Sequence, residues 1–304
     1  MITTSNAVML FILLTRRIIR HARRWLTLAG LLTLSACSTL QLAYNSSDEF
    51  LYWWVDSYVD LQDTQKPLVR NALKDLHQWH RQDQLPQYAA MLQRLQAMAP
   101  HNVSAAQVCA VTHDIQNNFV SLLHHVEPAT TELAMSLKPE QLQRMRQRYD
   151  SANQDWRDDW LTPDVEDRIK HRFKLSLNRL EDFYGKLDAP QREMIQQWLS
   201  QSKFVPELSY AERERRQTDS LQTLQRIANS KDMAQNQALL HGWLERSFNS
   251  PNERTRVYAQ ALWQDNCEGF AKLHNSTQPA QRERLLRTLK NYEADIRALM
   301  ARKP

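Results

Sequence analysis

The side chains best suited to metal or acid–base chemistry in this chain are histidines and carboxylates at helical spacing. His77 and His80 lie three residues apart and would share one face of a helix, where two imidazoles and a third ligand can bind a metal ion. No carboxylate stands beside them at ligand spacing, and the pattern H-E-x-x-H is absent. The alternative is that Trp79-His80-Arg81 packs the helix against a neighbour and that Leu85-Pro86 forms the turn after it. We favour packing and predict no metal site.

Two further clusters have the residue types of a site but not the spacing. His124-His125 and Asp158-Asp159 are adjacent pairs, and neighbouring residues of a helix point to different faces. Trp156 and Trp160, at i and i+4, are expected in the core. The sequence contains no G-x-S-x-G, Walker A or cysteine–histidine nucleophile pattern. We therefore predict that the chain is not an enzyme and uses no cofactor.

Two of the three cysteines, Cys109 and Cys267, are an even pair that lie far apart in the sequence. In an oxidising compartment they would form a disulfide that ties the N-terminal half of the chain to its C-terminal helices. The alternative is a pair of buried free thiols that behave as small hydrophobic residues. Spacing alone does not decide between the two.

The third cysteine ends the stretch Leu34-Ser35-Ala36-Cys37, which closes the apolar run 26–36, and five arginines precede that run. This layout is that of a secretory signal, and the apolar run is shorter than the ~20 residues of a membrane span. The four residues resemble the lipobox of bacterial lipoproteins. The resemblance implies cleavage before Cys37 and acyl chains, such as palmitate, on that residue. Ser38, which is not Asp, then favours the inner leaflet of the outer membrane, facing the periplasm.

The positive charge of the chain belongs to the predicted signal. The whole sequence has 39 basic and 34 acidic residues, and five of the arginines precede Cys37 with no acidic residue among them. The remainder is formally neutral, with both signs interleaved. Because a nucleic-acid-binding protein needs a basic stripe, we exclude nucleic acid as a partner.

The composition after Cys37 predicts an all-α fold. Only three glycines remain there, whereas hairpins and phosphate-binding loops depend on glycine. We expect a signal peptide at 1–36, a tether at 37–47, and a single all-helical periplasmic domain at 48–304. This domain would be a multi-helix bundle or an elongated array of about ten helices. Their expected ranges are 48–61, 64–81, 85–97, 104–126, 139–160, 163–184, 189–201, 209–228, 233–248, 252–273 and 279–302.

Several helix starts share a cap residue followed three positions later by glutamine. Ser104–Gln107 and Asp188–Gln191 have the form of a capping box, and 138–141 is a variant with lysine at the cap. The spacing between these starts is irregular, so we predict no solenoid. The starts also resemble the helix-start motif of periplasmic chaperones of the Spy and CpxP type, which bind unfolded proteins. Generic helix capping is the alternative interpretation.

A longer set of residues resembles an uncharacterised family of proteobacterial lipoproteins. The first block is Tyr44-Asn45, Trp53-Trp54, Asp60-Leu61, Gln65, Trp79-His80-Arg81 and Leu85-Pro86-x-Tyr88. The second block is Arg172, 181–185, Leu187, Gln191, Trp198 and Arg216-Gln217. The resemblance implies an envelope address and a helical fold. It implies no catalytic residue.

These observations predict a lipid-anchored envelope protein whose partners are the membrane, through its acyl chains, and other proteins. A chaperone or assembly role is the first hypothesis. The alternatives are a scaffold with one dedicated partner and a hydrolase of envelope polymers. For Trp53-Trp54 we expect core packing rather than a place in the membrane interface. For Arg213–Gln217 we expect a solvated face rather than a binding site.

Overall fold

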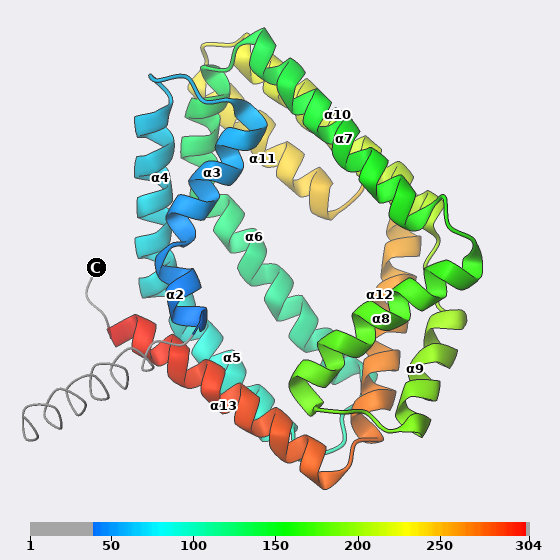
Figure 1. Cartoon of the computed structure of the whole chain (residues 1–304). Coiled ribbons are helices and arrows are strands. Elements are labelled where there is room, and N and C mark those ends of the chain that lie inside the picture. The colour runs from blue at the N-terminus through cyan, green and yellow to red at the C-terminus, as the bar shows by residue number, and fades with distance from the viewer. Residues whose placement is uncertain (1–38, 302–304) are drawn as a thin grey trace, which may run out of the picture. The chain divides into compact units, whose positions relative to one another are not determined.

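The computed structural model describes residues 39–301 (Figure 1). Every regular element in this range is helical, which confirms the predicted all-α fold. The described residues fall into two units: helix α2 (Thr39–Asn45) belongs to the first, and residues 47–301 belong to the second. Cys37 and the predicted signal peptide lie outside the described residues. Among the helices of 39–301, none has the length and apolar character of a membrane span.

The second unit contains the remaining helices. They are α3 (Ser47–Val59), α4 (Lys66–Trp79), η1 (His80–Gln84), α5 (Leu85–Met98), α6 (Ala105–Met135), α7 (Pro139–Trp160), α8 (Val165–Tyr184), α9 (Ala189–Ser200), α10 (Pro206–Ala228), α11 (Met233–Phe248), α12 (Glu253–Asn275) and α13 (Pro279–Ala301). Helix α6 runs beyond its expected end and past Pro128, because Thr131 and Ala134 of its last turns are buried. Helix α10 begins earlier than expected, at Pro206, since proline suits the first turn of a helix.

The chain is helical without interruption from α4 to α5, so the turn expected at Leu85-Pro86 is wrong. Helix α4 passes into the π-helical segment η1, and the Leu85 N–H donates to the carbonyl of His80, five residues back. Pro86 has no N–H, and in a regular α-helix its ring would clash with the carbonyl four residues before it. The wider π turn relieves this conflict. Leu85 is buried at the junction, which gives the continuous path a packing reason.

A pair of glutamines joins two helix starts that are far apart in the sequence. Gln65 precedes α4 and Gln141 lies in the first turn of α7, and each accepts a hydrogen bond from the backbone N–H three residues earlier (2.9 and 3.0 Å). Their amides also bond to each other, Gln65 Nε2 to Gln141 Oε1 at 3.1 Å and Gln141 Nε2 to Gln65 Oε1 at 2.8 Å. Each Nε2 donates further to a backbone carbonyl near the start of the other helix, that of Ser136 or Asp60. We call this arrangement the first glutamine clasp.

A second glutamine clasp repeats the same bonds between α9 and α13. Gln191 and Gln281 each accept from the backbone N–H three residues earlier (3.0 and 2.9 Å). Their amides pair reciprocally at 2.8 and 2.9 Å. Gln191 also donates to the carbonyl of Ser276, and Gln281 to that of Lys186, both at 3.1 Å. The capping box predicted at Asp188–Gln191 is confirmed and forms half of this clasp.

The two clasps mark an arrangement of four helices that occurs twice. Around the first clasp, α4 packs against α3 and α6, and α3 packs against α7. Around the second, α9 packs against α8 and α12, and α8 packs against α13. A trace of the repeat is visible in the sequence, where 136–141 and 276–281 both read Ser-x-x-Pro-x-Gln. The second unit is therefore built from two similar helical sets rather than from a solenoid.

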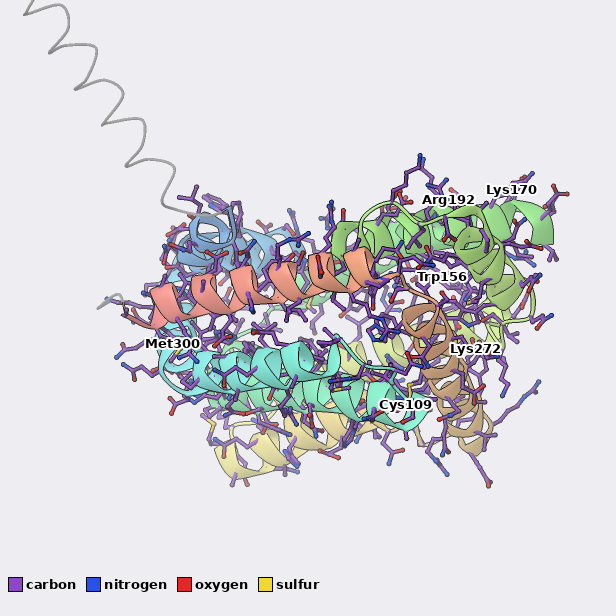
Figure 2. The ribbon with its side chains drawn as sticks, turned by 90° about the horizontal axis from the view of Figure 1, so that it is seen from below. Cys109, Trp156, Lys170, Arg192, Lys272 and Met300 are labelled. Carbon is purple, nitrogen blue, oxygen red and sulfur yellow. A yellow bond between two sulfur atoms is a disulfide. The ribbon has the colours of Figure 1, made fainter. Side chains whose placement is uncertain are left out.

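Helices between the repeated elements connect the two sets. Helix α5, which follows α4 in the chain, lies along α13 of the second set (Figure 2), and α10, which follows α9, lies along α7 of the first set (Figure 1). Helices α6 and α12 contact each other directly. Each set keeps its own core, in which the residue before the clasp cap, Leu61 or Leu187, is buried. Helix α11, which packs on α6 and α10, has no counterpart in the first set.

Replacing a clasp glutamine is expected to destabilise the fold more than replacing a glutamine that only caps a helix. In Gln191→Ala, a buried side chain is lost and the partly buried Ser276 carbonyl and Gln281 amide lose their partner, which predicts a loss of about 2–4 kcal/mol. Gln107→Ala is the matched control, because Gln107 is exposed and caps only its own helix (2.8 Å to the Ser104 N–H). It should lose only about 0.5–1 kcal/mol. Urea unfolding followed by circular dichroism measures both, and equal losses would contradict a role for the clasp.

Candidate binding surfaces

Helix α3 presents an exposed apolar face. Phe50, Trp53 and Trp54 are 67%, 61% and 60% exposed, and Leu51 beside them is 40% exposed. The core packing expected for Trp53-Trp54 is therefore wrong. The sequence misleads here because α3 is apolar on all sides, and periodicity does not tell which side faces the core. Exposed aromatic residues gathered on one helix are typical of an interaction surface.

The opposite side of α3 is fixed to the body of the unit, so the exposed face rests on a firm support. Tyr52 is only 4% exposed, and the guanidinium of Arg70 lies 3.8 Å from the centre of its ring. Arg70 Nη1 also pairs with Glu49 Oε1 at 3.0 Å, which ties the first turn of α3 to α4. Trp54 packs against Tyr58 with ring centres 5.1 Å apart. The side chains that back the face thus hold it in one orientation.

The residues Trp79-His80-Arg81 lie at the junction of α4 and η1. Trp79 stacks on His125 of α6, with ring centres 4.1 Å apart and planes inclined by 10°. His125 Nε2 lies 2.9 Å from Asp75 Oδ2. His80 packs against Tyr88, with ring centres 5.4 Å apart. Burial, followed by the neighbouring His77, lowers the pKa of His80, so its neutral form is favoured. These contacts hold α4, η1, α5 and α6 together.

The polar residues Arg213–Gln217 of α10 belong mostly to helix interfaces, so the solvated face expected for them is wrong. The buried side chain of Asn153, on α7, accepts from Arg213 Nε (2.7 Å) and Gln217 Nε2 (3.0 Å), and it donates to Gln217 Oε1 (2.7 Å). Arg216 is exposed, and its Nε donates to Glu212 Oε1 at 2.9 Å. The sequence shows that these residues are polar, but it does not show that Asn153 on α7 forms hydrogen bonds with them.

A buried carboxylate lies behind this cluster. Glu212 is 7% exposed and accepts from Arg215 (2.8 and 2.9 Å), Arg216 and Ser250. Burial raises its pKa, but these hydrogen bonds together outweigh burial, and the pKa lies below its ordinary value. Arg246 in turn pairs with Asp219 at 2.8 Å and lowers the pKa of that carboxyl. The network joins α10 to α11 and stays ionised at neutral pH.

The aromatic and acidic residues at the end of α7 do not form a cleft with paired carboxylates. Trp156 is half-buried and stacks on Tyr210, with ring centres 5.3 Å apart, and half-buried Trp160 packs edge-on against Phe204 at 5.6 Å. Asp158-Asp159 is exposed, and Asp158 accepts from a glutamine one turn away. The two tryptophans join helices at the margin of the core.

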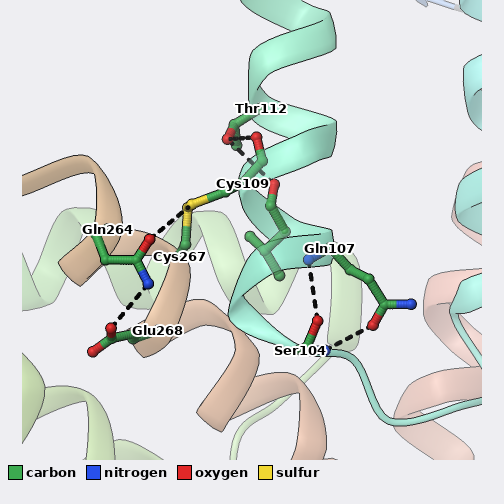
Figure 3. Close-up of a disulfide and its surroundings, with 8 residues drawn as sticks. Ser104, Gln107, Cys109, Thr112, Gln264, Cys267 and Glu268 are labelled. Carbon is green, nitrogen blue, oxygen red and sulfur yellow. Dashed lines mark hydrogen bonds between the residues drawn. A yellow bond between two sulfur atoms is a disulfide. The ribbon is translucent and has the colours of Figure 1, made fainter. Parts of the chain in front are cut away.

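A disulfide joins Cys109 and Cys267 and thereby links α6 to α12 (Figure 3). Their Cα atoms are 5.5 Å apart, and Cys267 is 3% exposed. The confirmed capping box Ser104–Gln107 starts α6 just before the bond. Close by, the Asn275 side chain holds both the N–H (2.8 Å) and the carbonyl (2.9 Å) of Val103. Covalent and hydrogen bonds therefore meet where the two helical sets touch.

One cluster of possible metal ligands is not predicted by the sequence. His124 and Glu127 of α6 meet His241 of α11, and one ligand atom from each lies within 4.8 Å of the others. His124 and His125 do point apart, as expected. His124 contacts Glu127 of its own helix and His241 of α11, whereas His125 contacts Asp75 of α4. The patterns H-x-x-E at 124–127 and H-x-x-x-E at 241–245 were the available signals. Neither predicts that the two helices meet.

A model of a family of unknown function (DUF6279) matches residues 57–245, more than half of the chain. The prediction of an uncharacterised family is confirmed at that level. No curated protein and no solved structure is significantly similar to the chain.

Loss of the disulfide is expected to lower stability without changing the helical content. In a Cys37→Ser background, Cys109→Ser/Cys267→Ser should lose about 2–5 kcal/mol in urea unfolding, because the bond closes a long loop. Alkylation of the denatured parent chain should label neither cysteine until reductant is added. Labelling of both cysteines without reductant would contradict the bond.

Proposed function

We propose that the chain, which belongs to this family of unknown function, is a lipid-anchored protein of the bacterial envelope. In the proposal the helical domain faces the periplasm and binds other proteins as a chaperone or assembly factor, without catalysing a reaction. The exposed apolar face of α3 is the observation that carries the binding role. The family name supplies no activity, so the support for this role comes from the residues of the chain itself.

The lipobox at 34–37 supports the address. Two or more acyl chains on Cys37 would give lasting membrane attachment, whereas one chain binds only marginally. Between Cys37 and Trp53, each helical residue adds about 1.5 Å of length, and each of the few other residues adds at most about 3.6 Å. The distance from Cys37 to Trp53 is therefore at most about 35 Å. An anchor on Cys37 would therefore keep the α3 face close to the membrane surface. Proteins that emerge from or dock at that membrane would meet this face first.

The chemistry of the α3 face supports protein binding. Phe50, Trp53 and Trp54 supply large apolar and aromatic area, and aromatic residues are enriched where protein interfaces gain most of their free energy. The inner side of α3 is held by the contact of Tyr52 with Arg70, so the helix that carries the face need not become ordered on binding. The resemblance of the helix starts to those of periplasmic chaperones points to the same role.

The alternative of an envelope-polymer hydrolase has less support. Glycoside hydrolysis needs two carboxylates that face each other across the scissile bond. The acidic pair closest to aromatic residues, Asp158-Asp159, is exposed at the end of α7 and does not converge on a cleft. We therefore keep the proposal to binding.

The anchor is tested by metabolic labelling. Cells that express the chain with radioactive palmitate should yield a labelled, membrane-bound protein. Cys37→Ser should carry no label and should leave the membrane fraction or remain unprocessed. Label retained in Cys37→Ser would overturn the proposed anchor, and Cys109→Ser is the matched control that should keep its label.

The binding role is tested with a variant that removes the α3 face and leaves its inner side intact. Phe50→Ser/Trp53→Ser/Trp54→Ser, in the Cys37→Ser background, should lose most of the parent's ability to suppress aggregation of unfolded client proteins. Its thermal unfolding should stay close to that of the parent, because the replaced side chains are exposed. The control is Val165→Ser/Leu175→Ser on α8, which replaces side chains of 62% and 50% exposure and should keep full suppression.

Three outcomes would count against a chaperone. The first is a parent protein that does not suppress aggregation. In the second, the α3 variant is as effective as the parent. The third is an α3 face that binds phospholipid vesicles but no client, which would make it a membrane contact. Crosslinking in cells that recovers one partner rather than many would instead favour the scaffold hypothesis.

A further inference from the structure

We propose that His124, Glu127 and His241 form a binding site for a divalent transition-metal ion of the zinc type. The residues come from α6 and α11, which pack side by side in the second unit. His124 Nδ1 contacts Glu127 Oε1, and His241 Nδ1 lies 3.2 and 3.3 Å from the two oxygens of Glu127. The two imidazole rings lie 5.2 Å apart. Three possible ligand atoms thus already lie close together between the helices.

The spacing suits a small cation. Zinc binds imidazole nitrogen and carboxylate oxygen at about 2.0–2.2 Å in a tetrahedral arrangement, which sets neighbouring ligand atoms about 3.4 Å apart. One atom from each of the three residues lies within 4.8 Å of the others, so small side-chain rotations bring them into range. His124 and Glu127 are fixed relative to each other because they are three residues apart on one helix.

The charge of the cluster also favours a cation. The Glu127 side chain is only 16% exposed, and in the part of the chain that the structure describes it pairs with the two imidazoles but with no lysine or arginine. A carboxylate that is partly removed from water needs a charged or hydrogen-bonding partner. A divalent ion would balance this charge and use the same nitrogen and oxygen atoms as ligands. The donor set of two nitrogens and one carboxylate is that of zinc and its neighbours rather than of calcium or magnesium.

Glu245 lies close enough to the site to become a supporting residue after a small side-chain movement. Its Oε1 lies 4.0 Å from Nε2 of His124, the nitrogen that faces away from Glu127. Metal-binding histidines commonly donate their second N–H to a carboxylate, which orients the ring. Glu245 follows His241 by one helical turn, so α11 would supply both a ligand and this support. The three direct ligands leave a fourth position for water.

The site would fasten α11 to the first helical set. Helix α11 has no counterpart in the repeat, and it joins α6 through residues more than one hundred positions apart in the sequence. A bound ion would hold this additional helix at a point that neither glutamine clasp nor the disulfide reaches. This inference is independent of the proposed protein-binding role.

Zinc titration of the tag-free Cys37→Ser chain tests the proposal, since no free thiol then competes for the ion. Calorimetry should show saturable binding of one zinc ion, and zinc should raise the unfolding temperature in a way that EDTA reverses. His241→Gln should weaken binding by at least about tenfold and abolish the shift in unfolding temperature. His241 is 52% exposed, so this variant should fold normally without metal.

Two further variants separate a site from general surface binding. Glu245→Gln should retain binding but weaken it by about tenfold, as expected for a supporting residue. His113→Ala, an exposed histidine on the same helix α6, should bind zinc like the parent. The proposal is overturned if the parent shows no saturable binding at micromolar zinc. It is equally overturned if His241→Gln binds as tightly as the parent, or if His113→Ala loses as much affinity as His241→Gln.

Discussion

Two pairs of glutamine amides hold together the helix starts on which the larger unit is built. A buried primary amide has one oxygen and one NH2 group. Either group destabilises the fold if it has no hydrogen-bond partner, because its lost contacts with water are not replaced. In both clasps every such group is used, because the oxygen accepts from its own helix start and from the partner, while the nitrogen donates to the partner and to a carbonyl. The same side chain therefore caps a helix and joins it to another. Any shift of one helix start would break bonds at both.

The remaining architecture follows from this constraint. Each clasp brings two helical hairpins together and closes a separate core behind Leu61 or Leu187. Neither set is independent, because α5 and α10 each cross to the other set and the Cys109–Cys267 bond joins α6 to α12. Covalent and polar bonds thus meet where the two sets touch, and the outer helices remain free to carry other functions.

The polar clusters divide into two kinds once their partners are known. Arg213, Arg215 and Gln217 look like a surface charge cluster, but they satisfy Asn153 and Glu212 inside helix interfaces. Their hydrogen bonds offset the free-energy cost of burying these polar groups. The His124–Glu127–His241 cluster differs, because within residues 39–301 its carboxylate pairs with imidazoles and with no lysine or arginine. The aromatic face of α3 differs again, because its large apolar side chains are exposed rather than packed against another helix.

The sequence by itself determined the helical class and several helix starts. Scarcity of glycine excludes hairpins, and a cap residue and a glutamine three positions later interact within a single turn, so both signals are local. It also predicted the family at the level that the comparison confirms. Local signals did not show the continuous helix through Pro86, where packing of Leu85 outweighs the turn tendency of proline.

Only the tertiary structure decided which surfaces face each other. Gln65 meets Gln141, His124 meets His241, and Trp53 faces outward although its helix is apolar on every side. Each of these facts depends on residues that are distant in sequence, and the pairing of distant helices is set by the summed packing of whole faces. Capping and periodicity act over one to three turns of a helix. These local signals identify residues that can form contacts between helices, and the packing of the helices determines which contacts form.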